Sequence, residues 1–463
     1  MRRSEVCFVL VTALLFARAE ASHAQGYGVY EQSACTMGRG GTAAARPCGD
    51  ASGMYYNPAG IAGLPLGGSI GGALIWPGTK WRNDDTQIDA SFLSKTYAIP
   101  NFYFVAPVAQ RYALGFGVYV PYGLTTEWDG ETFEGRFLGY KTSLKAIYLQ
   151  PTAAAQFGKL KIGAGLDVTY LSLNLQRKLD LSSQLLPAAA GAPPGATFGS
   201  LGVPYGTDFA NAVIDGSAWG IGYNLGATFD LTPQVSLGVR YLARQKITAD
   251  GGTAEFTQDP TGLVLTGGNP LGLPAGTPVD ALLAPQFATG GALVSQSVST
   301  TVRLPDQLVM GIAVTPIRAL TVLFDAQYTW WEVLDEIPLD FEILPNQALV
   351  LNDNSVWTWR FGAELLLNQE RDLKFRLGYI FHDAAAPDQS VVPNLPEAAR
   401  NDYSVGVGGR ISKTFYVDVA YMFVDAVNRR GRTIDLVPGG PITNGLYYDD
   451  NASLLSLTLT ATF

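Results

Sequence analysis

The chain carries little charge for its length. Lys, Arg, Asp and Glu make up 15% of its 463 residues, whereas soluble domains carry about 25%. It also lacks any apolar run of the roughly 20 residues that a membrane-spanning helix requires. These two absences exclude a helical membrane protein. The same composition is typical of a transmembrane β-barrel, in which each strand alternates between lipid-facing and lumen-facing residues.

Several kinds of chemistry lack the residues they need. No basic cluster stands out and the net charge is −9, which argues against nucleic acid as a partner. Only two histidines are present, and removal of a signal peptide would leave His382 alone, too few for a histidine metal site or a relay with an evident partner. Gly38–Gly41 lacks the Lys-Ser/Thr ending of a phosphate-binding loop. We therefore expect no cofactor, no metal and no catalytic residue.

Cysteine is scarce as well, with three in the chain. Residues 1–24 read as a secretory signal, with Arg2 and Arg3 before an apolar segment and small residues at the end. Its cleavage would remove Cys7 and leave Cys35 and Cys48. An exported chain crosses an oxidising compartment, where such a pair can close a loop. The alternative is two unpaired small residues.

Small residues dominate the stretch that follows the signal. Gly26–Gly63 is rich in Gly, Ala and Ser and has no sustained periodicity. Such a segment packs well inside another structure because backbones can approach closely at Gly and Ala. We therefore divide the chain into a signal peptide (1–24), an N-terminal plug or hatch (25–64) and a barrel (65–463), with the hatch inside the barrel lumen.

The barrel segment alternates with period two. At the C-terminus Leu455, Leu457 and Leu459 share one face, and Ser456 and Thr458 share the other. Counting such segments predicts an all-β fold, a fourteen-stranded antiparallel transmembrane barrel. The expected strands are Leu66–Trp76, Thr96–Pro107, Arg111–Tyr122, Tyr140–Phe157, Lys159–Gln176, Gly216–Phe229, Gln234–Thr248, Ser299–Thr315, Ala319–Trp331, Ser355–Leu367, Asp372–Phe381, Arg400–Ile411, Thr414–Val427 and Asn451–Phe463.

Two connections are much longer than the others, near residues 177–215 and 249–298. Both are unusually apolar, with segments such as LLPAAAGAPPGATF and ALLAPQFATGGALV. Loops of this length are generally functional or disordered. Their leucines and phenylalanines fit disorder poorly, so we favour an apolar rim that catches a hydrophobic ligand.

Several long motifs resemble those of the FadL/TodX family of outer-membrane transporters for hydrophobic compounds. EQSACTMGRGGTAAA followed by DASGMYYNPAG is similar to the family's N-terminal hatch. Further matches are RYALGFGVYVPYGLTTEW, RLPDQLVMGIAV and LGYIFHDAAAPDQSVVPNLPEAARNDYSVGVGGR, in the family's order. The two hatch cysteines depart from this pattern.

The resemblance implies a monomer in the outer membrane of a Gram-negative bacterium, surrounded by membrane lipid. A hydrophobic ligand would land between the long loops and leave sideways beside a kinked third strand, Arg111–Tyr122. Within that strand Pro121 cannot donate to a ladder, and glycine weakens strand regularity. The residues expected at this gate are Asn57, Pro58, Ala59, Gly115, Gly117 and Pro121.

Alternatives remain open at this point. A general porin for hydrophilic solutes is one, although the hatch and apolar loops speak against it. A barrel lipase built on His382 and a structural or adhesive barrel are others. The ligand is a fatty acid, an aromatic hydrocarbon or another lipid.

Overall fold

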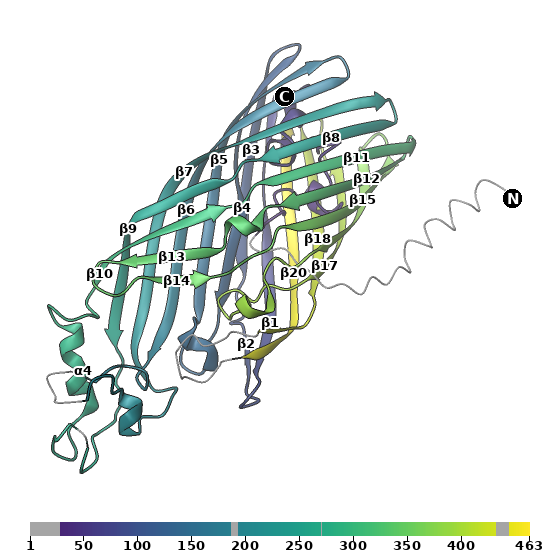
Figure 1. Cartoon of the computed structure of the whole chain (residues 1–463). Helices are drawn as coiled ribbons and strands as arrows, with labels where there is room; N and C mark the ends of the chain where they lie inside the picture. The colour runs from purple at the N-terminus through teal and green to yellow at the C-terminus, as the bar shows by residue number, and fades with distance from the viewer. Residues whose placement is uncertain (1–27, 187–192, 270, 432–443) are drawn as a thin grey trace.

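The computed structural model describes residues 28–186, 193–269, 271–431 and 444–463. The expected signal peptide and the first residues of the hatch lie outside these ranges. Fourteen of the described strands close into an antiparallel β-barrel, which confirms the predicted fold class (Figure 1). None of the helices among the described residues has the length and apolar character of a membrane-spanning helix.

The barrel strands follow one another in chain order around the wall, and the last pairs with the first. They are β1 (Gly67–Asn83), β3 (Tyr97–Ala109), β4 (Tyr112–Glu127), β5 (Lys141–Phe157), β6 (Leu160–Asp180), β7 (Asp208–Thr232), β8 (Val235–Leu242), β11 (Gln307–Ile317), β12 (Leu320–Thr329), β15 (Val356–Asn368), β16 (Leu373–His382), β17 (Arg400–Arg410), β18 (Phe415–Ala426) and β20 (Gly445–Thr462). Closure runs from Gly67↔Thr462 to Asn83↔Gly445, so the first and last strands of the wall pair with each other.

Shorter elements lie beyond one end of the barrel wall or inside its lumen. Outside the wall lie β2 (Asp89–Ser91), β9 (Gln245–Gln258), β10 (Gln296–Leu304), β13 (Glu336–Phe341), β14 (Gln347–Val350), β19 (Arg429–Gly431), α4 (Val279–Phe287) and the 3-10 turns η2 (Glu134–Phe137), η4 (Phe198–Leu201), η5 (Trp331–Val333) and η6 (Asp388–Ser390). The hatch contains α2 (Ala34–Met37), α3 (Gly53–Tyr56) and η1 (Pro58–Ile61).

The apolar face of each strand points away from the lumen. Leu455 and Leu457 are 43% and 55% exposed on the outer surface, whereas Ser456 and Thr458 are fully buried inside. This reverses the arrangement of a soluble sandwich and presents an apolar band to lipid. Short turns, such as the one between Phe157 and Leu160, lie at the end that holds Phe463, and the long loops lie at the other. The long-loop end is therefore extracellular.

Two expected strands are each divided in the structure. The segment expected at Gln234–Thr248 forms β8 and β9 with a break at Ala243–Arg244, and the one expected at Ser299–Thr315 forms β10 and β11 with a break at Pro305–Asp306. Pro305 has no N–H to donate, so the ladder stops there. The hairpin β9–β10 then continues past the wall, so the second long loop spans 259–295. Because β6 extends to Asp180 and β7 begins at Asp208, the first long loop spans 181–207.

Lumen glycines make room for the hatch. A Cβ added to Gly238 of β8 would lie 1.9 Å from the carbonyl oxygen of Ala44, and one added to Gly378 of β16 would lie 1.9 Å from the backbone nitrogen of Gly40. The hatch backbone thus contacts the strand backbone directly, and a side chain at either glycine would overlap it. Further glycines whose added Cβ would overlap the hatch are Gly115, Gly163, Gly226 and Gly362.

Enlarging one of these glycines should unseat the hatch. We expect Gly238→Val to lower the free energy of unfolding by about 1–3 kcal/mol, the usual cost of overpacking, measured by urea titration of the refolded barrel. Gly251→Val is the matched control, because an added Cβ there meets nothing within 4 Å. Equal midpoints for the two variants would show that the hatch does not depend on this contact.

Candidate functional site

The barrel wall has a break between β3 and β4. Their ladder runs from Ala109↔Tyr112 only as far as Phe102↔Val118. Beyond it β3 stays paired with β1, from Asn101↔Gly71 to Tyr97↔Ile75. On its other side β4 has a bulge against β5 between Tyr119 and Tyr122. The two strands therefore part over the outer half of β4.

The break is closed at both ends, by the β3–β4 ladder at one end and by contacts to Glu127 of β4 at the other. The backbone N–H of Leu93 donates to the carbonyl of Glu127 over 2.9 Å, and the Lys95 ammonium pairs with the Glu127 carboxylate over 2.8 Å. The opening is thus a window in the wall and not an open seam. A cavity of about 650 Å³ occupies it. Its apolar lining includes Ile75, Tyr97, Ile99, Val118, Val120, Leu124, Leu144 and Ile147.

The first described hatch residues cover the unpaired backbone of β4. The N–H of Val29 donates to the carbonyl of Pro121 over 2.9 Å. The Gln32 side chain bonds both backbone groups of Val120: its Oε1 accepts from the N–H over 3.1 Å, and its Nε2 donates to the carbonyl over 2.6 Å. Residues 28–32 therefore act as a substitute strand partner at the break, which sequence reasoning missed because the segment has no strand pattern.

Asn57 does not lie at the break in the wall. Its Nδ2 donates to the carbonyls of Ala44, Ala227 and Val239 over 2.6, 3.1 and 3.2 Å, so it joins the hatch to β7 and β8. The expectation that the turn at Asn57, Pro58 and Ala59 lies beside the third strand is wrong. The turn lies where its backbone can approach the barrel wall closely, because η1 packs onto glycines of β6 and β7. An added Cβ at Gly163 of β6 would lie 2.3 Å from Pro58.

The other expected gate residues do lie on β4, in two different settings. Gly115 and Gly117 are within the intact part of the β3–β4 ladder. An added Cβ at Gly115 would lie 2.2 Å from Cε of Met54, so this glycine accommodates α3. Pro121 lies at the break itself, where its carbonyl accepts the hatch N–H.

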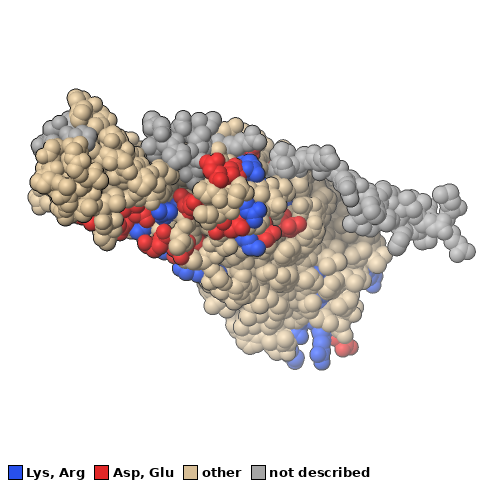
Figure 2. All heavy atoms as spheres, turned by 90° about the horizontal axis from the view of Figure 1, so that it is seen from below, with Lys and Arg blue, Asp and Glu red and all other residues tan. Residues whose placement is uncertain are grey.

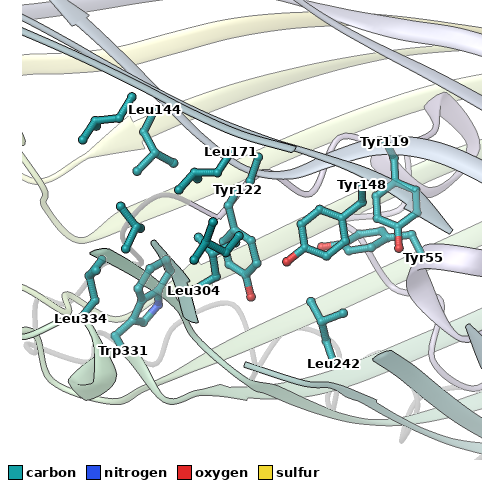
Figure 3. Close-up of a cluster of buried hydrophobic side chains, with 14 of the residues drawn as sticks. Tyr55, Tyr119, Tyr122, Leu144, Tyr148, Leu171, Leu242, Leu304, Trp331 and Leu334 are labelled. Carbon is teal, nitrogen blue, oxygen red and sulfur yellow. The ribbon is translucent and has the colours of Figure 1, made fainter. Parts of the chain in front are cut away.

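An apolar column fills the lumen on the outer side of the hatch (Figure 3). Its rings are in contact: Tyr55 and Tyr119 are 5.1 Å apart by centroid, Tyr119 and Tyr148 are 5.7 Å apart, and Tyr122 and Trp331 are 6.1 Å apart. Buried leucines complete it, including Leu144, Leu171, Leu242, Leu304 and Leu334. A water-filled lumen is lined by polar groups, so this filling favours hydrophobic solutes over water.

The two long loops pack together outside the wall. Phe198 and Leu181 of the first loop share a buried apolar cluster with Leu265, Leu271 and Leu283 of the second. Residues 181–207 contain no charged side chain, and Figure 2 shows few charges on this lobe, whereas charges gather around the adjacent mouth. The apolar side chains of the two loops therefore pack together within one folded lobe.

Charged groups meet the cavity on its inner side. Arg400 of β17 lines it and pairs loosely with Asp402, at 3.5 Å. Asp402 is held more tightly by Nε2 of His382, at 2.7 Å. In the hatch, burial raises the pKa of the Glu31 carboxyl, and Arg400 nearby opposes that shift. His382 also stacks on Tyr30 at 5.8 Å and is fully buried.

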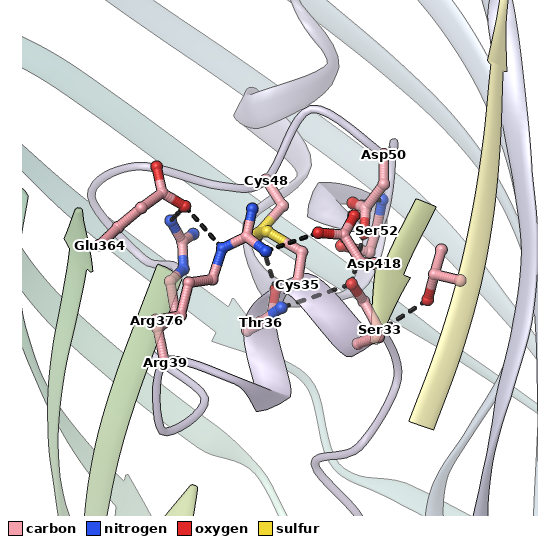
Figure 4. Close-up of a disulfide and its surroundings, with 12 residues drawn as sticks. Ser33, Cys35, Thr36, Arg39, Cys48, Asp50, Ser52, Glu364, Arg376 and Asp418 are labelled. Carbon is pink, nitrogen blue, oxygen red and sulfur yellow. Dashed lines mark hydrogen bonds and ion pairs between the residues drawn. A yellow bond between two sulfur atoms is a disulfide. The ribbon is translucent and has the colours of Figure 1, made fainter. Parts of the chain in front are cut away.

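Cys35 and Cys48 are joined by a disulfide, with their Cα atoms 6.4 Å apart. Around it the carboxylate of Asp50 accepts from Ser33 and Ser52 (Figure 4). Arg376 pairs with Glu364 and Asp418 over 2.7 and 2.5 Å. Within the described residues, Cys35, Cys48 and Asp50 are the group whose ligand atoms approach within 4.8 Å, but the bonded sulfurs offer no thiolate to a metal.

A closed barrel with a lipid-facing apolar surface, a seated hatch and an apolar lumen defines an outer-membrane transport barrel. The chain belongs to the family described as outer membrane protein transport protein (OMPP1/FadL/TodX), whose model matches residues 15–463. This confirms the resemblance seen in the sequence and the assignment to the Gram-negative outer membrane.

Curated relatives match along most of their length. Outer membrane protein P1 of Haemophilus influenzae is 23% identical over 445 residues, 90% of this chain and 89% of that protein. The long-chain fatty acid transport protein of Escherichia coli K12 is 23% identical over 412 residues, covering 86% and 87%.

Solved structures share the fold. A Pseudomonas aeruginosa FadL homologue superposes with a TM-score of 0.77 at 18% identity, covering 95% of this chain and all (100%) of that one. The Ralstonia pickettii toluene transporter TbuX gives a TM-score of 0.62 at 21% identity, covering 94% and 100%.

The disulfide should hold the hatch compact. Replacing both Cys35 and Cys48 by serine should cost about 3 kcal/mol of stability in the chain-entropy description of a short loop, measured by urea titration. Thiol labelling of the denatured, unreduced wild type should find no free thiol in the mature chain, and Cys35→Ser alone should expose one. Two reactive thiols in the wild type would contradict the bridge.

Proposed function

We propose that this protein carries hydrophobic molecules passively across the outer membrane and releases them sideways through the window between β3 and β4. The observation that carries the proposal is the cavity of about 650 Å³ at the point where the β3–β4 ladder stops. An apolar solute gains about 0.8 kcal/mol for each CH₂ it buries, so a path through apolar protein into lipid suits it better than a watery pore.

The path has three parts, each supported by packing. The apolar loop lobe offers a landing surface at the extracellular end. The aromatic column leads from Trp331 towards Tyr55 of the hatch. The window then opens on the hydrocarbon region once residues 28–32 move away from β4. All three parts lie within one chain, so we infer that the monomer suffices.

The relatives point to the same class of cargo. One is named a long-chain fatty acid transport protein and another a toluene transporter. A seated hatch disfavours a general porin. We assign no catalytic step, since His382 has structural partners in Asp402 and Tyr30.

Locking the hatch to β4 should stop transport. An added Cβ at Gly123 lies 3.6 Å from Cγ2 of Val29, so cysteines at positions 29 and 123 are close enough to bridge. In a background with Cys35 and Cys48 changed to serine, the oxidised double-cysteine protein should reduce uptake of a radiolabelled long-chain fatty acid to that of cells lacking the protein. Reduction should restore uptake, and each single cysteine should have no effect. Unchanged uptake with the bridge confirmed would refute a sideways exit at this window.

Arg400 should distinguish acids from hydrocarbons. Its guanidinium lies on the inner side of a largely apolar cavity, where it can pair with a carboxylate. Arg400→Met should weaken binding of a long-chain carboxylate by roughly tenfold or more, the size of a hydrogen bond to a charged group, and leave binding of an alkane of equal length unchanged. Calorimetry on the purified barrel measures both ligands, and Lys145→Met, also at the cavity, is the control. Equal losses for acid and alkane would mean that Arg400 only supports packing.

A further inference from the structure

Two basic side chains lie on the outward face of the hairpin β9–β10, and a third immediately precedes β9. Lys246 and Arg303 are directly opposite each other in the ladder. Both point outward, since Lys246 is exposed and the Arg303 side chain is 41% exposed, whereas the alternating Ile247 and Leu304 are buried. Arg244, two positions before Lys246, exposes 62% of its side chain. We call Arg244, Lys246 and Arg303 the basic patch.

The basic patch lies at the outer margin of the apolar band. Below it the rings of Tyr223 and Tyr241 are 6.0 Å apart. The hydroxyl of Tyr241 and Nε of Arg244 both donate to Oδ2 of Asp306, over 2.9 and 3.1 Å. Tyrosine and tryptophan mark the membrane–water interface in barrels, and the long-loop end is extracellular. The patch is therefore at the level of the head groups of the outer leaflet.

Without a bound anion, the basic patch contains an electrostatic repulsion between like charges. Like charges directly opposite each other destabilise a sheet. Arg244 pairs with Asp306 at 2.9 Å and Arg303 pairs with Asp335 at 3.4 Å, but exposed pairs of this kind are weak. For Lys246 the described part of the chain supplies no ion pair. An anion placed between Lys246 and Arg303 would turn this repulsion into attraction.

An apolar surface adjoins the charges. Ile247 packs beside Gly220 of β7, and on either side of that glycine Trp219 and Ile221 are 61% and 73% exposed to the outside. A ligand that touches both surfaces must have an anionic head and an apolar body. This favours a membrane lipid over a free anion.

We propose that the basic patch binds the phosphate groups of a phosphorylated glycolipid in the outer leaflet, with acyl chains along the apolar outer surface of β7. Guanidinium groups bind phosphate through paired hydrogen bonds, and lysine adds a compact charge. Such a contact would fix the rotation and depth of the barrel in an asymmetric membrane. It uses no residue of the window, the column or the hatch, so it stands apart from the transport proposal.

The test uses the purified, lipid-stripped full-length mature barrel and native mass spectrometry. The probes are bis-phosphorylated lipid A, its dephosphorylated form and inorganic phosphate. We expect Lys246→Gln/Arg303→Gln to bind bis-phosphorylated lipid A roughly tenfold more weakly than wild type, as expected when charge-assisted contacts are lost. The control is Lys80→Gln/Arg82→Gln, which removes two exposed basic residues of the same rim that pair with Asp449 and Asp89 at 2.8 Å.

Three results would each overturn the proposal. They are equal affinity of the double variant and wild type, equal affinity for the phosphorylated and dephosphorylated lipids, and displacement of the lipid by millimolar inorganic phosphate. Heat-modifiable gel mobility checks that each variant is folded. If the double variant fails this check, Lys246→Gln alone replaces it, with Lys246→Arg expected to retain binding.

Discussion

A backbone in hydrocarbon must have its hydrogen bonds satisfied by protein, since each bare group costs several kcal/mol. The barrel meets this requirement by closure everywhere except between the outer halves of β3 and β4. There the hatch supplies the missing partners through Val29 and the side chain of Gln32. The wall is thus completed by a segment that is not part of it. A partner held by a few bonds can leave at far lower cost than a strand held by a full ladder.

The hatch can serve as a removable partner only if the rest of it stays in place. Its lower part is held by direct backbone contact at Gly238 and Gly378, by Asn57 against β7 and β8, and by the disulfide between Cys35 and Cys48. Asp325 of β12 accepts from the N–H groups of Ala43 and Ala44 over 2.7 and 2.9 Å. These contacts concentrate at the periplasmic side. Residues 28–32 have partners of their own, since the hydroxyl of Tyr103 donates to the carbonyl of Gln32 and Nε2 of Gln327 donates to the hydroxyl of Tyr30, each over 3.1 Å, and these bonds must break if the segment leaves β4.

The period-two pattern predicted the barrel and its fourteen strands because outward positions must be apolar along every strand. It also located the third strand and Pro121. It could not place the hatch, because a segment of small residues has no periodicity and its seat is decided by which strand glycines it meets. Asn57 was misplaced for that reason. The division of β8 from β9 was missed because most apolar residues stay at odd-numbered positions on both sides of Ala243–Arg244. In the structure the buried face changes there, with Leu242 and Ala243 both buried, and Pro305 on the partner strand was the available signal.

The apolar column explains why one barrel needs both a hatch and a window. Tyrosines and leucines above Tyr55 exclude water and would hold a hydrophobic solute, but below them lies a charged layer of Arg39, Glu364, Arg376 and Asp418. An apolar solute that continued straight down would lose its contacts and enter that layer, at about 0.8 kcal/mol for each CH₂ exposed again. The window at β4 lies above this layer and opens on lipid. The proposed sideways release would therefore keep an apolar solute in largely apolar surroundings, which straight passage through the charged layer would not.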